Sequence, residues 1–193
     1  MHLTHFNDLI QATVTDSIQV AQSFFNANQA LVETCARKMA DTLASGNKIL
    51  LFGNGGSAAD CQHIAAEFVN RFAMERPPLA ALALTCDTSV ITSIGNDYSF
   101  DDIFKKQVQA LGRKNDLALA ISTSGNSSNV IRAAEQAREM GLFLVGFSGP
   151  AGQLTGLCDI GFNVGSPVTA RIQETHILLA HILCDLTERL LFR

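Results

Sequence analysis

Residues 48–57 read Lys48-Ile-Leu-Leu-Phe-Gly-Asn-Gly-Gly-Ser57, a short apolar segment that leads straight into a glycine-rich turn. The pattern predicts a strand at 48–52 and a helix at 57–72 on the far side of the turn. Such a turn presents backbone N–H groups and the positive end of a helix dipole, and so suits a phosphate. His63 and Glu67 follow on one face of the same helix. These features predict chemistry on a phosphorylated small molecule.

The rest of the chain repeats this alternation of strand and helix. Further apolar runs bounded by turn residues predict strands at 79–84, 116–121, 142–147 and 159–164. Helical patterns occupy 88–95, 99–111, 126–140 and about 168–191. This order is typical of an α/β protein, here a three-layer sandwich with a central, mostly parallel five-stranded sheet.

The first part of the chain is predicted to be helical. Apolar positions at helical spacing in 8–26 and 28–45 predict two helices that form an N-terminal hairpin, closed by Gly46-Asn47. The 193 residues fit one domain, with helices over 1–46 and the sheet and long last helix over 47–193.

The composition limits the possible partners. The chain is 47% hydrophobic and 17% charged, which predicts that part of its surface is buried between subunits. The formal net charge is −4 and no long basic run occurs. The chain therefore lacks both the positive charge and the basic cluster that are typical of nucleic-acid-binding proteins. The basic segment from Arg71 to Arg76 is interpreted as a solvated loop.

The cysteines and the hydropathy indicate a cytoplasmic protein that does not enter a membrane. Five cysteines with no CxxC pair favour buried reduced thiols over a disulfide framework. The first residues lack the pattern of a signal peptide, and no apolar run approaches the roughly 18–20 residues of a membrane span.

A second polar turn, Ser122-Thr-Ser-Gly-Asn-Ser127, follows the strand predicted at 116–121 and again leads into a helix. Strands of an open parallel sheet end at one edge, where ligands bind, so both turns could face one ligand. Their hydroxyl and backbone N–H groups could hold a phosphate without a lysine, although simple capping of the helix would explain the same residues. Neither turn matches a Walker A loop or the dinucleotide fingerprint.

Other candidate residues leave alternatives open. The His63/Glu67 pair suits metal binding or acid–base work, but a surface pair without a function has the same spacing. The last helix carries Gln173, His176 and His181, and the spacing does not decide which histidine serves a site. Gly95-Asn96-Asp97 is either a helix stop or a site for sugar hydroxyls.

Taken together, the motifs resemble the SIS (sugar isomerase) domain and, within it, the bacterial phosphoheptose isomerases. The matching segments are Gly53-Asn-Gly-Gly-Ser57, His63-x-x-x-Glu67, Gly95-Asn-Asp97, Ala120-Ile-Ser-Thr-Ser-Gly-Asn-Ser127, and Arg171-Ile-Gln-Glu174 with His181. They run from about residue 48 to 185 in the family's order and spacing. The resemblance implies a flavodoxin-like SIS fold.

The resemblance also implies an activity and a site. The reaction is conversion of sedoheptulose 7-phosphate to D-glycero-D-manno-heptose 7-phosphate, the entry to the heptose of the lipopolysaccharide core. One zinc ion per subunit would be held by His63, Glu67, Gln173 and His181. A homotetramer with active sites at subunit interfaces is implied. The implied substrate contacts are Asn54, Gly55, Gly56, Ser57, Glu67, Asn96, Asp97, Ser122, Thr123, Ser124, Ser127 and Gln173.

Two comparisons within the family qualify this assignment. Many members have an acidic residue where this chain has Ala170, so a role for that acid is in doubt. A non-catalytic tetrameric relative binds the bacterial replication initiator, but it lacks an acid at the Glu67 position and a histidine at the His181 position. Because this chain has both, we expect an enzyme, with Glu67 as base and His181 as acid of an enediol mechanism.

Overall fold

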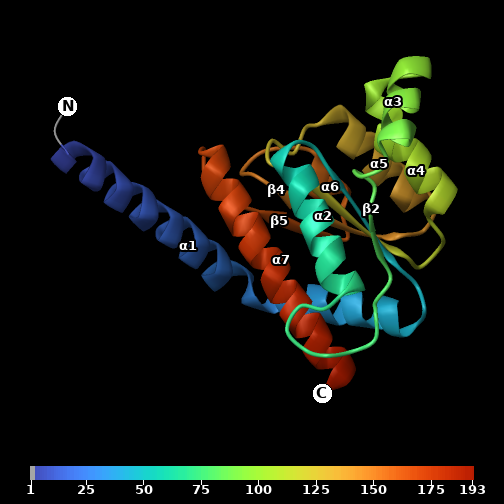
Figure 1. Cartoon of the computed structure of the whole chain (residues 1–193), viewed down its shortest axis with the longest axis horizontal. Helices are drawn as coiled ribbons and strands as arrows, with labels where there is room; N and C mark the ends of the chain where they lie inside the picture. Colours follow the sequence, from blue (N-terminus) through green and yellow to red (C-terminus); the bar gives the residue numbers. More distant parts are fainter. Residues whose placement is uncertain (1–2) are drawn as a thin grey trace.

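The computed structural model describes residues 3–193 and forms three layers around one parallel sheet (Figure 1). The strands are β1 (Ile49–Gly53), β2 (Ala81–Ala83), β3 (Leu117–Ser122), β4 (Phe143–Ser148) and β5 (Ile160–Asn163). They lie in the order β2-β1-β3-β4-β5, and every pairing is parallel. The predicted α/β sandwich is confirmed, and the order is the flavodoxin-like one.

The two faces of the sheet are covered by different helices. Strand residues alternate between two cores, so Ile49 and Leu51 pack on one face while Leu50 and Phe52 pack on the other. The first core includes α1 (Leu3–Ala44), α2 (Gly56–Val69) and α7 (Thr169–Phe192). The second core includes α3 (Thr88–Asp97), α4 (Ile103–Leu111), α5 (Ser128–Glu139) and the short α6 (Leu154–Leu157). A 3₁₀ turn, η1 (Phe100–Asp102), precedes α4.

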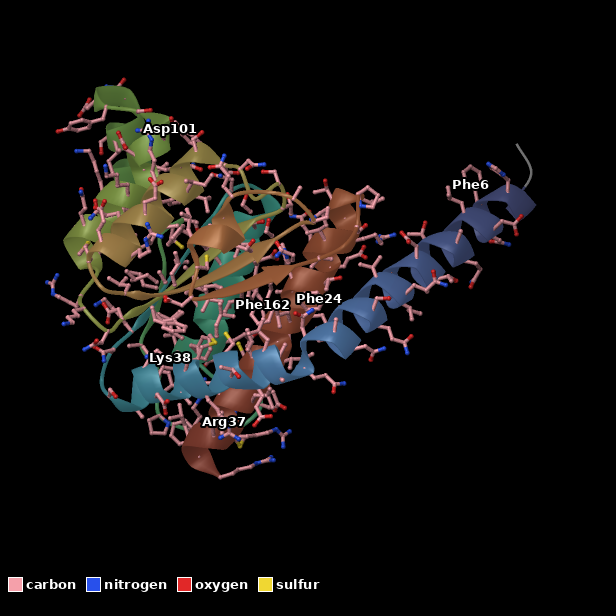
Figure 2. The ribbon with its side chains drawn as sticks, turned by 180° about the vertical axis from the view of Figure 1, so that it is seen from behind. Phe6, Phe24, Arg37, Lys38, Asp101 and Phe162 are labelled. Carbon is pink, nitrogen blue, oxygen red and sulfur yellow. The ribbon has the colours of Figure 1, made fainter. Side chains whose placement is uncertain are left out.

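The predicted N-terminal hairpin is wrong, because α1 is one helix of 42 residues. No glycine or proline occurs before Gly46, so the chain contains no residue that would end a helix earlier. The helix changes direction near Phe24 (Figure 2), where the side chain of Asn28 donates to the Phe24 carbonyl at 2.8 Å. The predicted stop is correct, since Gly46 has a φ of 76°.

The predicted helix at 57–72 ends earlier, at Val69. The backbone N–H groups of Phe72, Ala73 and Met74 donate instead to the carboxylate of Glu188 on α7. A helix continuing through these residues would use those donors in its own ladder, so this tertiary contact ends α2. The remaining elements start or end within a few residues of the predictions, and α6 was not predicted.

Two further observations concern the whole described chain. Over residues 3–193, each helix is either too short or too polar to cross a bilayer. All five cysteines are unpaired, and Cys35, Cys61 and Cys184 are buried. Residues 1–2, where the predicted domain begins, lie outside the described residues.

Candidate active site

The two polar turns meet at one edge of the sheet. Strands β1 and β3 are neighbours, with Gly53 paired to Ile121, so the turns that follow them lie side by side. Asn54 and Asn129 join them through two reciprocal side-chain amide hydrogen bonds of 2.8 and 2.9 Å. This is the point where the strand order reverses, which is where ligands bind in such sheets. The two turns are therefore neighbours, and a shared ligand remains a prediction.

The serine-rich turn gathers its hydroxyls. Ser122 Oγ lies 3.0 Å from Ser127 Oγ and 3.4 Å from Ser124 Oγ, and Gly125 adopts a left-handed φ of 66°. Thr123 contributes its carbonyl, which accepts from the N–H of Gly149 at 3.1 Å. Beside the turn is a cavity of about 250 Å³, lined by Thr123, Ser124, Pro150, Ala151, Ser166, Pro167, Thr169 and Ile172. Clustered hydroxyls beside a helix start can hold a phosphate without a basic side chain.

The glycine-rich turn brings the two site helices together. Gly55 has a φ of 54°, which glycine adopts without strain, and precedes α2. A Cβ on Gly56 would stand 2.1 Å from Nε2 of Gln173, so the Gln173 amide lies directly against this backbone. Ser57, in the first turn of α2, is only 4% exposed.

His63, Glu67 and His181 form a cluster further along α2 and α7. Nε2 of His63 lies 2.9 Å from Nε2 of His181 and 3.4 Å from Oε1 of Glu67. The ring of Phe72 packs against His181 with 5.6 Å between centroids. From Gly56 to His63 the helical rise is about 10 Å. The cluster therefore lies about two turns along α2 from the glycine-rich turn.

Comparison with known proteins identifies the family. The SIS domain matches residues 14–149. The phosphoheptose isomerase of Nitratidesulfovibrio vulgaris strain Hildenborough is 59% identical over 178 residues, 92% of this chain and 86% of that protein. The chain belongs to the phosphoheptose isomerases of the SIS domain family. The isomerase assignment is confirmed, and the adaptor alternative is not favoured.

Other relatives agree in sequence and in structure. The phosphoheptose isomerase of Aneurinibacillus thermoaerophilus is 48% identical over 190 residues, which are 97% of this chain and 96% of that protein. The structure of phosphoheptose isomerase GmhA from Neisseria gonorrhoeae superposes with a TM-score of 0.90 at 43% identity, covering 95% of this chain and 99% of that one.

The structure separates the two histidines of α7, between which the sequence could not choose. His181 joins the cluster, whereas His176 is 1% exposed and its Nε2 lies 3.1 Å from the Ser148 carbonyl oxygen. Burial lowers the pKa of His176 to about 4, against a raising effect of the contact with Ser148. This isomerase therefore keeps His176 neutral in its core.

The buried His176 predicts an acid-dependent loss of stability. Its pKa is about 4 in the folded protein and 6.5 for the free side chain, so between these values mainly the unfolded chain binds the proton. The free energy of unfolding should fall as the pH drops from 6.5 to 4, by about 3 kcal/mol from this group. Urea unfolding at several pH values between 4 and 6.5 measures this loss. The free energy of unfolding of His176→Leu should depend less steeply on pH than that of the wild type. An unchanged slope would contradict a neutral, buried His176.

The cluster of His63, Glu67 and His181 offers donor atoms that a metal could use. Among residues 3–193, no three His, Cys, Asp or Glu side chains are already arranged around a common point. The Nε2 atoms of the two imidazoles lie 2.9 Å apart, and two ligand atoms of a tetrahedral zinc would stand about 3.3 Å apart. A small increase in the distance between the two Nε2 atoms would therefore admit the ion. Imidazole and carboxylate are ligands that zinc accepts. The two imidazoles and the Glu67 carboxylate therefore fit zinc, whereas Gln173 lies at the glycine turn, about 12 Å along α7 from His181.

Not every predicted residue is brought to this site. Asn96 and Asp97 are exposed at the end of α3, and among the described residues the side-chain hydrogen bond of Asn96 goes to Asp97 itself, at 2.8 Å. Two residues near the site were missed. Asn129 hydrogen-bonds to Asn54. Asp60, on α2, lies near His63 of the same helix and near His181 of α7. Burial raises the pKa of Asp60, while His63 and His181 lower it. Asp60 and His63 are three residues apart and so share one face of the helix, and this spacing could have indicated Asp60 as a site residue.

Proposed function

We propose that the chain interconverts sedoheptulose 7-phosphate and D-glycero-D-manno-heptose 7-phosphate through an enediol. One observation supports the proposal: His181 of α7 meets His63 and Glu67 of α2, the helix that begins at the glycine-rich turn. The names of the close relatives support the same reaction class.

Each residue of the site has a proposed role. Ser122, Thr123, Ser124 and Ser127 bind the phosphate and fix the reacting carbons by remote binding energy. Glu67 removes the proton from C1 of the ketose while His181 supplies one to the oxygen on C2, which gives the enediol. Return of a proton to C2 and loss of one from the oxygen on C1 completes the aldose. Asn54, Gly55, Gly56, Ser57 and Gln173 lie at the glycine turn, while Asn96 and Asp97 remain proposed sugar contacts.

We propose one zinc ion per subunit, with His63, Glu67, Gln173 and His181 as ligands that different chains of a homotetramer contribute. Such an ion would polarise the sugar carbonyl. Metal content measured by mass spectrometry should be about one zinc per wild-type chain, and lower in His63→Ala. Full turnover by protein stripped of metal with a chelator would exclude a catalytic role for zinc.

The activity is tested by incubating the purified protein with several ketose phosphates and following the aldose by NMR. Sedoheptulose 7-phosphate should be converted fastest, with exchange of solvent deuterium at the carbon that receives the proton. Preference for a five- or six-carbon ketose phosphate would overturn the proposed substrate. Absence of turnover together with binding of the replication initiator would favour the adaptor.

Gly125→Ala should weaken substrate binding through the serine-rich turn. Gly125 has a φ of 66°, and a Cβ there would stand 2.3 Å from Oγ of Ser148. Both effects shift the turn, so we expect KM for the sugar phosphate to rise by about tenfold or more. Gly156→Ala is the matched control, because a Cβ at Gly156 meets nothing within 4 Å. An unchanged KM in Gly125→Ala would contradict a phosphate role for the turn.

We propose a homotetramer with active sites at subunit interfaces. The first half of α1 extends away from the body of the molecule (Figures 1 and 2). Five apolar residues there are 47–60% exposed, and their positions fall on one face of the helix, namely Phe6, Leu9, Ile10, Val14 and Ile18. Such a stripe on a helix favours burial against another subunit. Light scattering should show a tetramer that Ile10→Asp with Ile18→Asp disrupts.

We also propose a cytoplasmic location and a role in supplying heptose for the lipopolysaccharide core. The five unpaired cysteines support a reducing compartment. Loss of heptose from the lipopolysaccharide of a deletion strain would test the role.

A further inference from the structure

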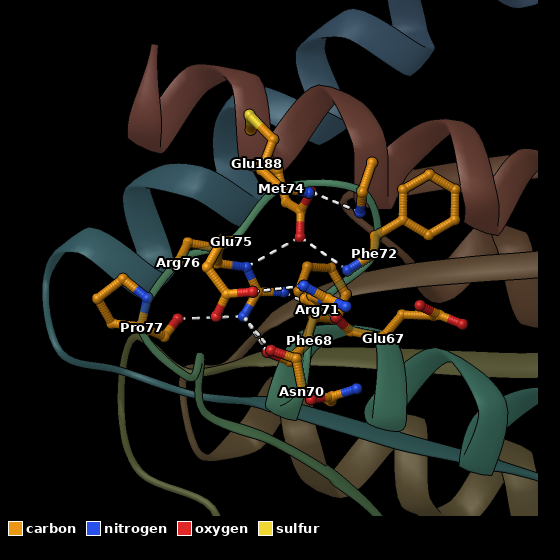
Figure 3. Close-up of polar contacts among 11 residues, drawn as sticks. Glu67, Phe68, Asn70, Arg71, Phe72, Met74, Glu75, Arg76, Pro77 and Glu188 are labelled. Atoms are coloured by element: carbon orange, nitrogen blue, oxygen red, sulfur yellow. Dashed lines mark hydrogen bonds and ion pairs between the residues drawn. The ribbon is translucent and has the colours of Figure 1, made fainter.

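A buried ion pair links the two helices that carry the acid–base residues (Figure 3). Arg76 lies in the segment after α2 and Glu188 lies on α7, with 2.9 Å between Nε and Oε1. Their side chains are 1% and 0% exposed. The interpretation of this segment as a solvated loop was wrong for Arg76, because tertiary packing buries it.

The pair forms hydrogen bonds to backbone groups that have no partner in a helix or strand. Glu188 accepts from the N–H groups of Phe72, Ala73 and Met74 at 2.8–3.0 Å. The guanidinium of Arg76 donates to four carbonyl oxygens at 2.6–3.2 Å, those of Glu67, Phe68, Asn70 and Pro77. The irregular segment and the end of α2 are thereby held to α7 by one continuous network.

Two of these contacts lead directly to the site. Nη2 of Arg76 donates at 2.7 Å to the carbonyl oxygen of Glu67. Oε1 of Glu188 accepts from the N–H of Phe72, whose ring packs against His181. The network therefore touches the backbone of one proposed acid–base residue and the packing partner of the other. Figure 3 shows Arg76 between Glu67 and Glu188.

We propose that Arg76 and Glu188 are positioning residues that set the placement of Glu67 relative to His181. This inference rests on the proposed acid–base roles of those two residues. Proton transfer demands correct placement of both groups, and a displacement of about 1 Å costs on the order of 10²-fold in rate. An exposed pair would not fix two helices this way, whereas a buried, planar guanidinium with several acceptors does.

Arg76→Lys tests the proposal, because it keeps the charge but loses the planar set of donors. Assays are run at a temperature where circular dichroism shows the variant fully folded. We expect kcat to fall by about 10²-fold, with KM and the affinity for inorganic phosphate within about threefold of wild type. A purely structural role would lower the melting temperature and leave kcat of the folded enzyme unchanged.

Glu188→Asp is the second variant, should Arg76→Lys fail to fold, and it withdraws the carboxylate by one methylene. Asp185→Ala is the matched control, since Asp185 forms a more exposed pair with Arg189 on the same helix. A folded variant of the pair with kcat within about threefold of wild type overturns the positioning role. Glu67→Gln is assayed alongside: if it is fully active, the acid–base roles fail, whereas an inactive Glu67→Gln with active pair variants refutes only this inference.

Discussion

Replacing Glu67 with Gln should reduce kcat by about 10³-fold while leaving the fold intact. The amide keeps the size and shape of the carboxylate but cannot take the proton from carbon. Glu67 is partly exposed and its side chain makes one close ion-pair contact, at 3.4 Å to His63. Its loss should therefore cost little stability. The measurement is the rate of conversion of sedoheptulose 7-phosphate, with thermal unfolding recorded on the same sample.

Two comparisons make the result interpretable. Glu139→Gln changes an exposed acid at the end of α5 and should retain wild-type kcat. His181→Ala should lose turnover to a similar degree as Glu67→Gln. Wild-type activity in either site variant would refute its assigned role, and a large fall in melting temperature would assign the loss to misfolding.

Replacing Glu188 with Ala should lower the free energy of unfolding by about 3–5 kcal/mol, because it leaves the buried guanidinium of Arg76 without its partner. Three backbone N–H groups lose their acceptor at the same time. For a chain of this length the melting temperature should fall by roughly 6–20 °C. Calorimetry or urea unfolding of the two proteins measures the difference.

The loss of stability in Glu188→Ala should depend on the pH and on the burial of the ion pair. Burial alone would raise the pKa of Glu188, but three N–H donors and Arg76 hold it below its usual value. The charged carboxylate therefore stabilises the fold above its unfolded pKa, and this contribution is lost as the pH falls through the lower folded value. Glu33→Ala removes half of an exposed pair with Arg37 and should cost about 0–1 kcal/mol. Equal losses for both variants would contradict the importance of burial.

The pattern of apolar runs and turn residues predicted most of the fold, because apolar runs indicate directly which segments are buried. Apolar runs such as Ile49–Phe52 are strands covered on both faces, and left-handed glycines such as Gly46 and Gly125 end or connect elements. The prediction of an N-terminal hairpin was wrong because the spacing of apolar residues does not distinguish one bent helix from two. The chain has no residue there that must break a helix.

The sequence by itself determined the parallel sheet, the two polar turns and the residue types for a sugar-phosphate isomerase, since the alternation of strands and helices along the chain and the chemistry of the turns are local properties. The spacing of His176 and His181 did not choose between them, and the tertiary structure shows that His181 meets His63, because the choice depends on which face of α7 packs against α2. It alone paired Arg76 with Glu188, 112 residues apart. Contacts between distant segments depend on how whole helices pack, and no short-range pattern encodes that.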